Sequence, residues 1–210
     1  MCGDADAPRT GKTTMAHPKE EITLLLVKPD GVKRGLTGEI VRRIEMRGLK
    51  VVGLSMIRPE RKELDNHYPK DEGWLTRVGE KTLATYEKYG YDAVAELGTT
   101  DALAIGKEVR NWLLDFMTSG PIVKIAVQGI HAVEMVRKLV GATMPSAAEM
   151  GTIRGDFSVD SAAAANRDKR SVHNLAHASE TVDEAKKELM LWFAENEIHP
   201  YKRAEEDTMF

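Results

Sequence analysis

The chain has 210 residues, of which 42% are hydrophobic and 30% charged, the balance of a globular protein whose core folds without disulfide or metal staples. Its 30 Lys and Arg against 33 Asp and Glu give a net charge of −3, which argues against a nucleic-acid coat but leaves room for a local cationic site for a small polyanion. No apolar run approaches the roughly 18 residues of a membrane helix. A transporter, an extracellular scaffold and a disordered chain are excluded.

Residues 1–20 are polar and without periodicity, and we expect them to form a flexible arm. The arm lacks the pattern of a secretory signal, and Cys2 is the only cysteine, so we expect a reducing, cytoplasmic location. Gly11-Lys12-Thr13-Thr14 resembles the end of a phosphate-binding P-loop, but Asp6 stands where that motif needs glycine, and no strand precedes it. A disordered tail is the preferred interpretation.

The next segment predicts a strand, a helix and a second strand. Residues 22–27 form a continuous apolar run, typical of a buried strand. Apolar residues then recur every four positions up to Gly48, which predicts an amphipathic helix with Leu36, Ile40 and Ile44 on its buried face. Residues 51–57 predict the second strand, which Pro59 ends.

Residues from about 70 to 105 predict a helical insertion that leaves the core, because a charged stretch has helical spacing at Leu83, Tyr86 and Tyr89. A helix over 107–117 follows and is broken by Ser119-Gly120-Pro121. Residues 122–127 predict a third strand, and the spacing of Val133, Val136 and Val140 predicts a third core helix.

Residues 141–170 are expected to be a loop, because the alanine run after Ser161 is too short to nucleate a helix alone. A short strand is predicted at 172–176. The last helix should start at Thr181, which forms a capping box with Glu184, and its expected buried stripe is Val182, Ala185, Leu189, Trp192 and Phe193.

This order predicts an α/β sandwich of the ferredoxin-like βαββαβ type, with helices covering one face of a four-stranded, mostly antiparallel sheet. We expect a single domain over 21–203 and a tail at 204–210. The sequence contains no internal repeat and no metal-binding spacing of cysteine and histidine.

Three basic residues occupy positions that packing does not require. Lys28 ends an apolar strand before a turn, Arg137 lies among valines, and Arg154 stands between glycines, where the backbone is able to approach a ligand closely. A solvated strand end and a snorkelling side chain are the ordinary interpretations of the first two.

His177 is the most informative residue, because it is predicted at a strand-to-helix junction. The N-terminus of a helix favours negative charge, so an anion is stabilised beside it. A histidine of ordinary pKa, about 6.5, is mostly neutral at pH 7, and nearby Lys28, Arg137 and Arg154 would lower that pKa further. The ring is therefore a candidate nucleophile, although a lone histidine is more often structural.

Seven short polar segments follow one another along the chain: Val27-Lys28-Pro29-Asp30-Gly31-Val32 with Arg34-Gly35-Leu36, His67-Tyr68, Ser119-Gly120-Pro121, Arg137, Gly141-Ala142-Thr143, Gly151-Thr152-Ile153-Arg154-Gly155-Asp156-Phe157, and Asn174-x-x-His177-x-Ser179. In this order they resemble the motifs of the nucleoside diphosphate kinase family. The resemblance extends from about Ile22 to Tyr201.

The resemblance implies a reversible ping-pong phosphotransferase that maintains nucleoside triphosphate pools. The γ-phosphoryl group passes from a nucleoside triphosphate, mainly ATP, to a histidine matched by His177, and then to a nucleoside diphosphate. It also implies Mg²⁺ carried on the nucleotide phosphates and a homo-oligomer, either a hexamer or a tetramer built from dimers. Neither nucleic acid nor membrane is needed.

The family motifs imply the nucleotide-binding residues position by position. Lys28 and Asn174 match residues that hold the sugar hydroxyls and the end of the phosphate chain. The phosphate-binding positions are matched by Arg137, Thr143 and Arg154. Cations aimed at the spreading negative charge are what phosphoryl transfer asks of a protein.

Three further residues match supports of the reaction. Tyr68 matches a tyrosine beside the transferring group, Glu188 matches the acid on the far ring nitrogen, and Ser179 matches the serine that orients this acid. A carboxylate there fixes the tautomer and leaves the attacking nitrogen unprotonated. The usual Gly-Ser-Asp after the histidine is Ala178-Ser179-Glu180 here, which is expected to shift the backbone slightly.

The family stacks the nucleobase on an aromatic residue at the start of the helix before the Ser-Gly-Pro break. Counting back from that break gives Val109, whereas counting forward from Tyr68 gives Trp74, and helix geometry favours Val109. About 33 extra residues before Val109 and about 10 between Arg154 and Asn174 fall where the family holds the base. A purely apolar contact predicts that all common bases are accepted.

Two other classes are weighed against this hypothesis. An interaction protein that keeps the fold without the chemistry should have lost the histidine, the lysine or an arginine, and none is lost. An RNA-binding domain of ferredoxin-like fold needs aromatic residues on its central strands, and residues 24–27 and 122–127 contain none.

Overall fold

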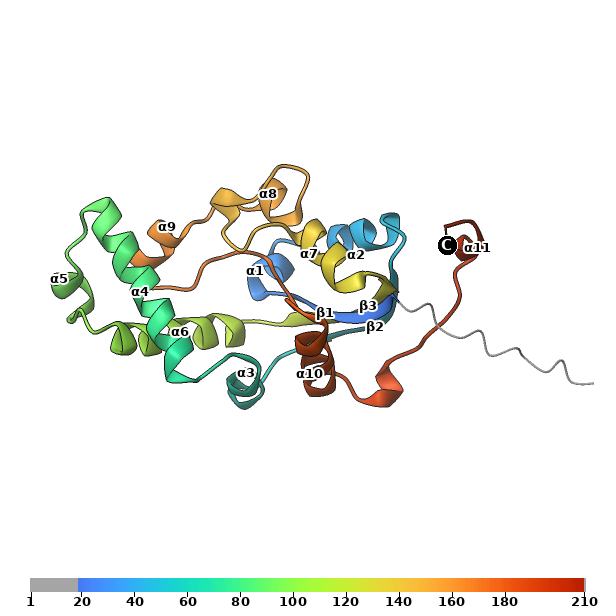
Figure 1. The fold of residues 1–210 in the computed structure, drawn as a ribbon, viewed down its shortest axis with the longest axis horizontal. Coiled ribbons are helices and arrows are strands. Elements are labelled where there is room, and N and C mark those ends of the chain that lie inside the picture. Colours follow the sequence, from blue (N-terminus) through green and yellow to red (C-terminus); the bar gives the residue numbers. More distant parts are fainter. Residues whose placement is uncertain (1–18, 210) are drawn as a thin grey trace, which may run out of the picture.

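The computed structural model describes residues 19–209, so Cys2 and the segment Gly11-Lys12-Thr13-Thr14 lie outside the described residues. At its centre is a four-stranded sheet in the order β2-β3-β1-β4 (Figure 1). The strands are β1 (Glu20–Val27), β2 (Lys50–Ile57), β3 (Ile122–Ile130) and β4 (Ala176–Ala178). Every pairing is antiparallel, which confirms the ferredoxin-like sandwich.

The helices surround this sheet and include all those expected before residue 141. They are α1 (Pro29–Lys33), α2 (Thr37–Met46), α3 (Arg61–His67), α4 (Glu72–Tyr89), α5 (Ala93–Leu97), α6 (Ala102–Thr118), α7 (Ala132–Val140), α8 (Ile153–Phe157), α9 (Ala162–Arg167), α10 (Val182–Trp192) and α11 (Glu206–Met209). Within residues 19–209, no helix is both long and apolar enough to cross a lipid bilayer.

Helices cover both faces of the sheet, so the expectation of a single covered face was wrong. Leu25 and Val27 of β1 pack under α2, α7 and α8, whereas Leu24 and Leu26 pack against α3, α6 and α10. Successive strand residues point to opposite faces, and all four of these leucine and valine side chains are fully buried. The unbroken apolar run of β1 is therefore the consequence of a sheet buried on both sides.

The segment between α7 and β4 differs from its predicted form. It contains the short helices α8 and α9, and the Ser161 hydroxyl caps α9 by accepting from the backbone N–H of Ala164. The strand expected at 172–176 is instead β4, which begins only at Ala176. Leu175 has a φ of 69°, a left-handed conformation that interrupts an extended strand.

Helix α10 begins as predicted after Thr181, whose hydroxyl accepts from the N–H of Glu184 at 3.1 Å. The Glu184 carboxylate bonds the N–H of Glu180 rather than that of Thr181, so the expected capping box is one-sided. Val182 is 38% exposed, and the buried stripe instead consists of Ala185, Glu188, Trp192 and the following Phe193. A glutamate thus occupies the face of α10 that meets the sheet.

The insertion forms α4 and α5, which together with α6 make a helical arm at the left of Figure 1. Helices α4 and α6 cross closely at Gly79 and Gly106. A Cβ atom on Gly79 would lie 1.8 Å from the carbonyl oxygen of Ala102, and one on Gly106 would lie 1.9 Å from that of Leu75. Only glycine fits at this crossing.

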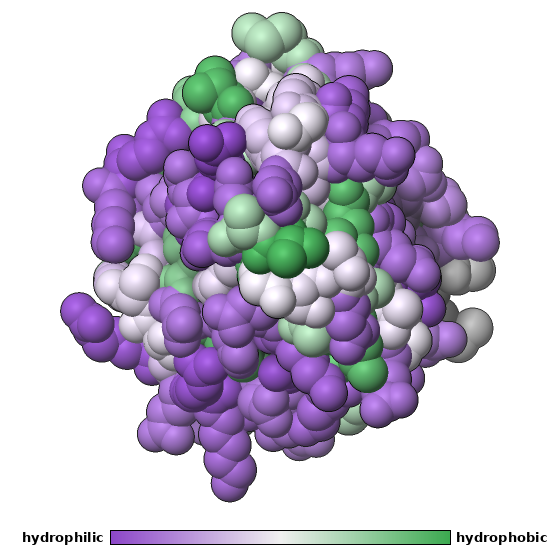
Figure 2. Space-filling view, turned by 90° about the vertical axis from the view of Figure 1, so that its left-hand side faces the viewer, coloured by the Kyte–Doolittle hydropathy of each residue, from purple (hydrophilic) through white to green (hydrophobic). Residues whose placement is uncertain are grey.

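The arm also contacts α9 of the long connection before β4. The Tyr86 hydroxyl donates to the carbonyl of Asn166 at 3.2 Å, and the Arg167 guanidinium lies over the Tyr91 ring, 4.7 Å from its centre. The outer end of the arm is mostly hydrophilic in Figure 2, where apolar atoms form separate small spots rather than one patch. The arm and α9 therefore support each other.

Candidate active site

His177 lies at the middle of the edge strand β4, opposite Leu26 of β1. Its Nε2 is 2.8 Å from Oε1 of Glu188 on α10, and the Ser179 hydroxyl donates to the other carboxylate oxygen at 2.6 Å. Because a carboxylate only accepts, Nε2 carries the ring hydrogen and Nδ1 keeps its lone pair. Within the described residues, no hydrogen bond reaches this Nδ1 atom.

Lys28 and Asn174 meet beside this ring although they are far apart in the sequence. The Lys28 ammonium donates to the Asn174 side-chain oxygen at 2.7 Å, and the Asn174 amide donates to the carbonyl of Thr143 at 2.9 Å. Lys28 and Asn174 are both buried. Because desolvated polar groups strengthen one another, this contact fixes the ammonium in place.

The two arginines differ in how much of their charge is already engaged. Arg154 is buried and donates to three backbone carbonyls, those of Gly141, Asn174 and Ala176. It therefore braces the segment before His177, with two of its five N–H groups left over. Arg137 of α7 is 43% exposed and, among the described residues, meets only Glu180, at 3.5 Å, so its guanidinium is available to an incoming anion.

The electrostatics of the site keep the ring neutral. Burial, followed by the charge of Lys28, lowers the pKa of His177 from 6.5 to about 3, against the opposing charge of Glu184. Burial also lowers the pKa of Lys28 to about 8, with Arg154 acting in the same direction. At neutral pH the site thus combines a deprotonated imidazole with protonated cations, as a nucleophile for phosphate requires.

Tyr68 and His67 lie directly behind the ring. The Tyr68 hydroxyl is buried without a hydrogen-bond partner among the described residues, and its ring centre lies 6.5 Å from that of His177. Burial, reinforced by the charge of Glu188, raises the pKa of Tyr68, so it stays a neutral donor. A buried orphan hydroxyl is costly unless a ligand satisfies it.

His67 is a site residue to which the sequence assigned no role. Its ring packs edge-on against His177 with centres 4.6 Å apart, its Nδ1 is 3.3 Å from the Glu188 carboxylate, and the Trp192 indole donates to this Nδ1 at 3.2 Å. The only signal for it was its place beside Tyr68 in a motif. The contact itself joins α3 to β4, which no local pattern reveals.

Asp30 and Gly31 hold the backbone that precedes the nucleophile, a role the motif alone did not reveal. The Asp30 carboxylate accepts from the N–H of Leu175 at 3.0 Å, and the carbonyl of Leu175 accepts from the N–H of Lys28 at 2.8 Å. A Cβ on Gly31 would lie 2.9 Å from that carbonyl oxygen. These contacts maintain the left-handed conformation of Leu175, which costs about 1–3 kcal/mol in a non-glycine residue.

A shallow cleft of about 300 Å³ lies between α6 and residues 169–173, walled by Trp112, Phe116 and His173. Val109 is half-buried and lies on the same side of α6, because positions 109, 112 and 116 share one helix face. Trp74 lies instead in the first turn of α4, where its backbone N–H donates to the side chain of the capping Asp71. Val109 is not among the residues that line this cleft, so its contact with the base stays a prediction, and the cleft adds Trp112, Phe116 and His173 as candidates.

The substituted motif after the histidine spans the end of β4 and the turn before α10. Ala178 continues β4, and Ser179 is fully buried at its bond to Glu188. Glu180 is exposed at 71% and faces Arg137.

A family model described as nucleoside diphosphate kinase matches residues 21–75 and 102–198. The chain belongs to this family. The matched ranges leave out residues 76–101, the outer part of the helical arm.

Relatives with the same description align over most of the chain. The nucleoside diphosphate kinase of Pyrobaculum aerophilum is 47% identical over 85% of this chain and 97% of its own length. A crystal structure of an NDP kinase from the same organism superposes with a TM-score of 0.83 at 45% identity, covering 86% of this chain and 100% of that one. The Borrelia burgdorferi enzyme, described as a transition-state mimic with bound vanadate and ADP, has a TM-score of 0.71 at 35% identity, over 90% and 96% of the two chains.

Proposed function

We propose that the chain is a nucleoside diphosphate kinase that works through a phosphohistidine at Nδ1 of His177. The lone pair of Nδ1 attacks the γ-phosphorus of a nucleoside triphosphate, mainly ATP, and the bond from that phosphorus to the bridging oxygen breaks to release the diphosphate. A terminal oxygen of a second nucleoside diphosphate then attacks the same phosphorus, and the P–N bond returns its electron pair to Nδ1. The observation that carries the proposal is the Glu188 carboxylate on Nε2, which leaves Nδ1 free.

The surrounding side chains suit the charges of this reaction. The exposure of Arg137 and the bond that fixes Lys28 to Asn174 support a role for both in binding the phosphate chain. The Tyr68 hydroxyl, which has no partner in the part of the chain that the structure describes, supports a role in binding the transferring group. The contacts of Thr143 and Arg154 with Asn174 support the same assignment of these residues to the nucleotide site.

Mg²⁺ belongs to this proposal as an ion carried by the nucleotide phosphates, whose charge it would partly neutralise. The cluster that comes closest to a metal site within residues 19–209 is His67, His177 and Glu188. Two imidazole nitrogens do not suit Mg²⁺, which prefers oxygen ligands, and the neighbouring cations oppose an ion there. These side chains therefore agree with a Mg²⁺ ion that the nucleotide phosphates hold, rather than one that the protein holds.

The decisive experiment is the formation of an acid-labile, alkali-stable phosphoprotein from labelled ATP. We expect His177→Gln to remove both the label and the phosphoryl transfer. His199→Gln is the matched control, since His199 is an exposed histidine outside the site and should keep both. Normal turnover by the His177 variant, free of contaminating kinase, would overturn the mechanism.

The base is expected to be covered by apolar contact with Val109 and the neighbouring cleft, without selection among bases. The halophilic family enzyme of Halobacterium salinarum, described as a complex with CDP, superposes with a TM-score of 0.63 at 29% identity, over 91% of this chain and 99% of that one. Steady-state competition among nucleoside diphosphates tests the expectation. Discrimination above about a hundredfold, or about 2.7 kcal/mol, would mean that the cleft reads the base and that Val109 is misassigned.

We further propose a homo-oligomer, a hexamer or a tetramer of dimers, in the cytoplasm. The edge strand β2 supports association, because its Leu54 and Met56 are 51% and 58% exposed. Light scattering that gives the mass of one chain would contradict it, and cell fractionation tests the location. The division into an arm at 1–20, one domain at 21–203 and a tail at 204–210 belongs to the same proposal, and limited proteolysis tests it.

A further inference from the structure

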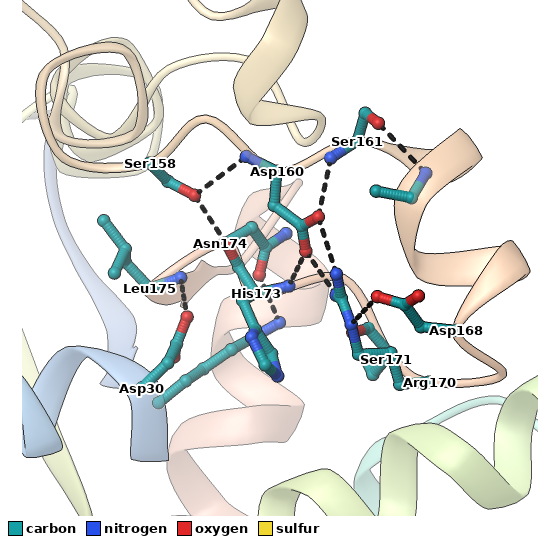
Figure 3. A network of polar contacts seen from close by, with 12 residues as sticks. Asp30, Ser158, Asp160, Ser161, Asp168, Arg170, Ser171, His173, Asn174 and Leu175 are labelled. Carbon is teal, nitrogen blue, oxygen red and sulfur yellow. Dashed lines mark hydrogen bonds and ion pairs between the residues drawn. The ribbon is translucent and has the colours of Figure 1, made fainter.

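Asp160, in the connection between α8 and α9, gathers hydrogen bonds from three residues around it (Figure 3). Its carboxylate accepts twice from the Arg170 guanidinium, at 2.6 and 3.1 Å, and once each from the backbone N–H groups of Ser161 at 2.9 Å and His173 at 2.7 Å. The Asp160 side chain is only 11% exposed. A shielded, bidentate pair of this kind is stronger and more directional than an ordinary surface ion pair.

The contact with His173 matters because this residue directly precedes the nucleotide-site segment. The N–H of His173 donates to Asp160, and its carbonyl accepts from the Ser158 hydroxyl at 2.7 Å. Both backbone groups of His173 are therefore held by the segment 158–160. The next residue, Asn174, is the one whose side chain holds the Lys28 ammonium.

The charge of Asp160 is stable in this position. Burial alone would raise the pKa of its carboxyl, but the hydrogen bonds from Arg170, His173 and Ser161 outweigh burial and lower it. The backbone N–H of Ser146 also donates to the carbonyl of Asp160, which ties the same residue to the loop after Thr143. Asp160 thus connects the two backbone segments that flank the Asn174 side chain.

We propose that Asp160 is a positioning residue for the nucleotide, which it serves by fixing the His173 backbone and thereby aiming Asn174 and Lys28. The inference rests on the proposed kinase function and deepens it. Asp160 does not touch the reacting atoms. Its loss should loosen nucleotide binding and leave the chemistry of His177 intact, because Glu188 and Ser179 hold that ring independently.

Two phosphoryl donors separate these effects. ATP needs the whole nucleotide site, whereas phosphoramidate is a small donor with no sugar or diphosphate for Asn174 and Lys28 to hold, and it needs chiefly the His177 nucleophile. For Asp160→Ala we expect the KM for ATP to rise about tenfold, as loss of hydrogen bonds to a charged group suggests. The rate of His177 phosphorylation by phosphoramidate should change less than twofold.

Asp168→Ala is the matched control, because Asp168 also pairs with Arg170, at 3.1 Å, but is 58% exposed and bonds a different guanidinium nitrogen. This substitution should change neither the KM for ATP nor the rate of phosphorylation by phosphoramidate. If Asp160→Ala folds poorly, Ser158→Ala removes the bond to the His173 carbonyl and the weaker bond from the Asp160 N–H at 3.4 Å but keeps the carboxylate, and a smaller rise in the KM for ATP is expected. Rescue by Asp160→Glu would further support the carboxylate's role.

If the phosphorylation rates of Asp160→Ala fell equally with both donors, in proportion to a loss of folded protein, Asp160 would be merely structural. That result would overturn the inference. So would an unchanged KM for ATP in a folded Asp160→Ala variant. Failure of the unaltered protein to be phosphorylated by either donor would instead overturn the kinase function, and this inference with it.

Discussion

Replacing Glu188 with glutamine tests how much the carboxylate behind His177 contributes to the reaction. The amide keeps the size of the side chain and an oxygen that accepts from Nε2, so the 2.8 Å contact and the fold should survive. As Nδ1 attacks phosphorus, the ring gains positive charge, which a carboxylate stabilises more than an amide. A hydrogen bond to a charged group contributes about 1.5–3 kcal/mol and a neutral one about 0.5–1.5 kcal/mol. The difference of about 1–1.5 kcal/mol predicts roughly tenfold slower phosphorylation.

The assay is rapid-quench measurement of phosphoenzyme formation from saturating ATP, with urea unfolding to verify the fold. Asp183→Asn is the matched control, because Asp183 is on the same helix but 89% exposed. We expect the control to keep the rate of the unaltered protein. An unchanged rate in Glu188→Gln would refute the reasoning and leave Glu188 as an ordinary buried residue of α10.

Three further predictions concern pH and packing. Because the pKa of Lys28 is about 8, kcat/KM should fall above that pH as the ammonium loses its proton; a pH–rate profile that stays flat to pH 10 would contradict this. The pKa of His177 is 6.5 in the unfolded chain and about 3 in the folded protein, so the unfolded chain binds this proton first as the pH falls. The free energy of unfolding should therefore decrease from pH 6.5 toward pH 3, and urea titrations across this range would detect the decrease. Gly79→Ala should destabilise the protein by about 3 kcal/mol, because the added Cβ clashes with α6. Gly38→Ala should stabilise it by about 0.5–1 kcal/mol, because nothing lies within 4 Å of the added Cβ. Equal midpoints of urea unfolding for the two variants would argue against the close crossing.

The fold was predictable where a local pattern and the tertiary environment agree. The apolar run of β1 and the helical period of α2 and α7 follow from burial on both sides of one sheet. Helix α9 was missed because its stability comes from α4, through the bond of Tyr86 to Asn166, rather than from its own short sequence. The strand at 172–176 was wrong because the conformation of Leu175 is imposed by Asp30, which is distant in the sequence.

The candidate site was predictable from the sequence only in outline. A histidine among cations pointed to a nucleophile, but its bond to Glu188 was implied by resemblance, since a spacing of 11 residues across a turn has no periodic signature. The contact of His67 with His177 and the cleft between Phe116 and His173 join separate elements. Such contacts depend on topology, which no single segment encodes.

The contact between the helical arm and α9 limits how this protein and its relatives could exchange parts. Ala165 and Asn166 of α9 are buried, and the hydroxyl of Tyr86 in the arm donates to the Asn166 carbonyl. A chimera that kept α9 but lost residues 76–101 would leave these groups open to water, and a chimera with the arm alone would expose the Tyr86 ring. The arm and α9 are thus a matched pair, to be transplanted together if the recipient is to fold.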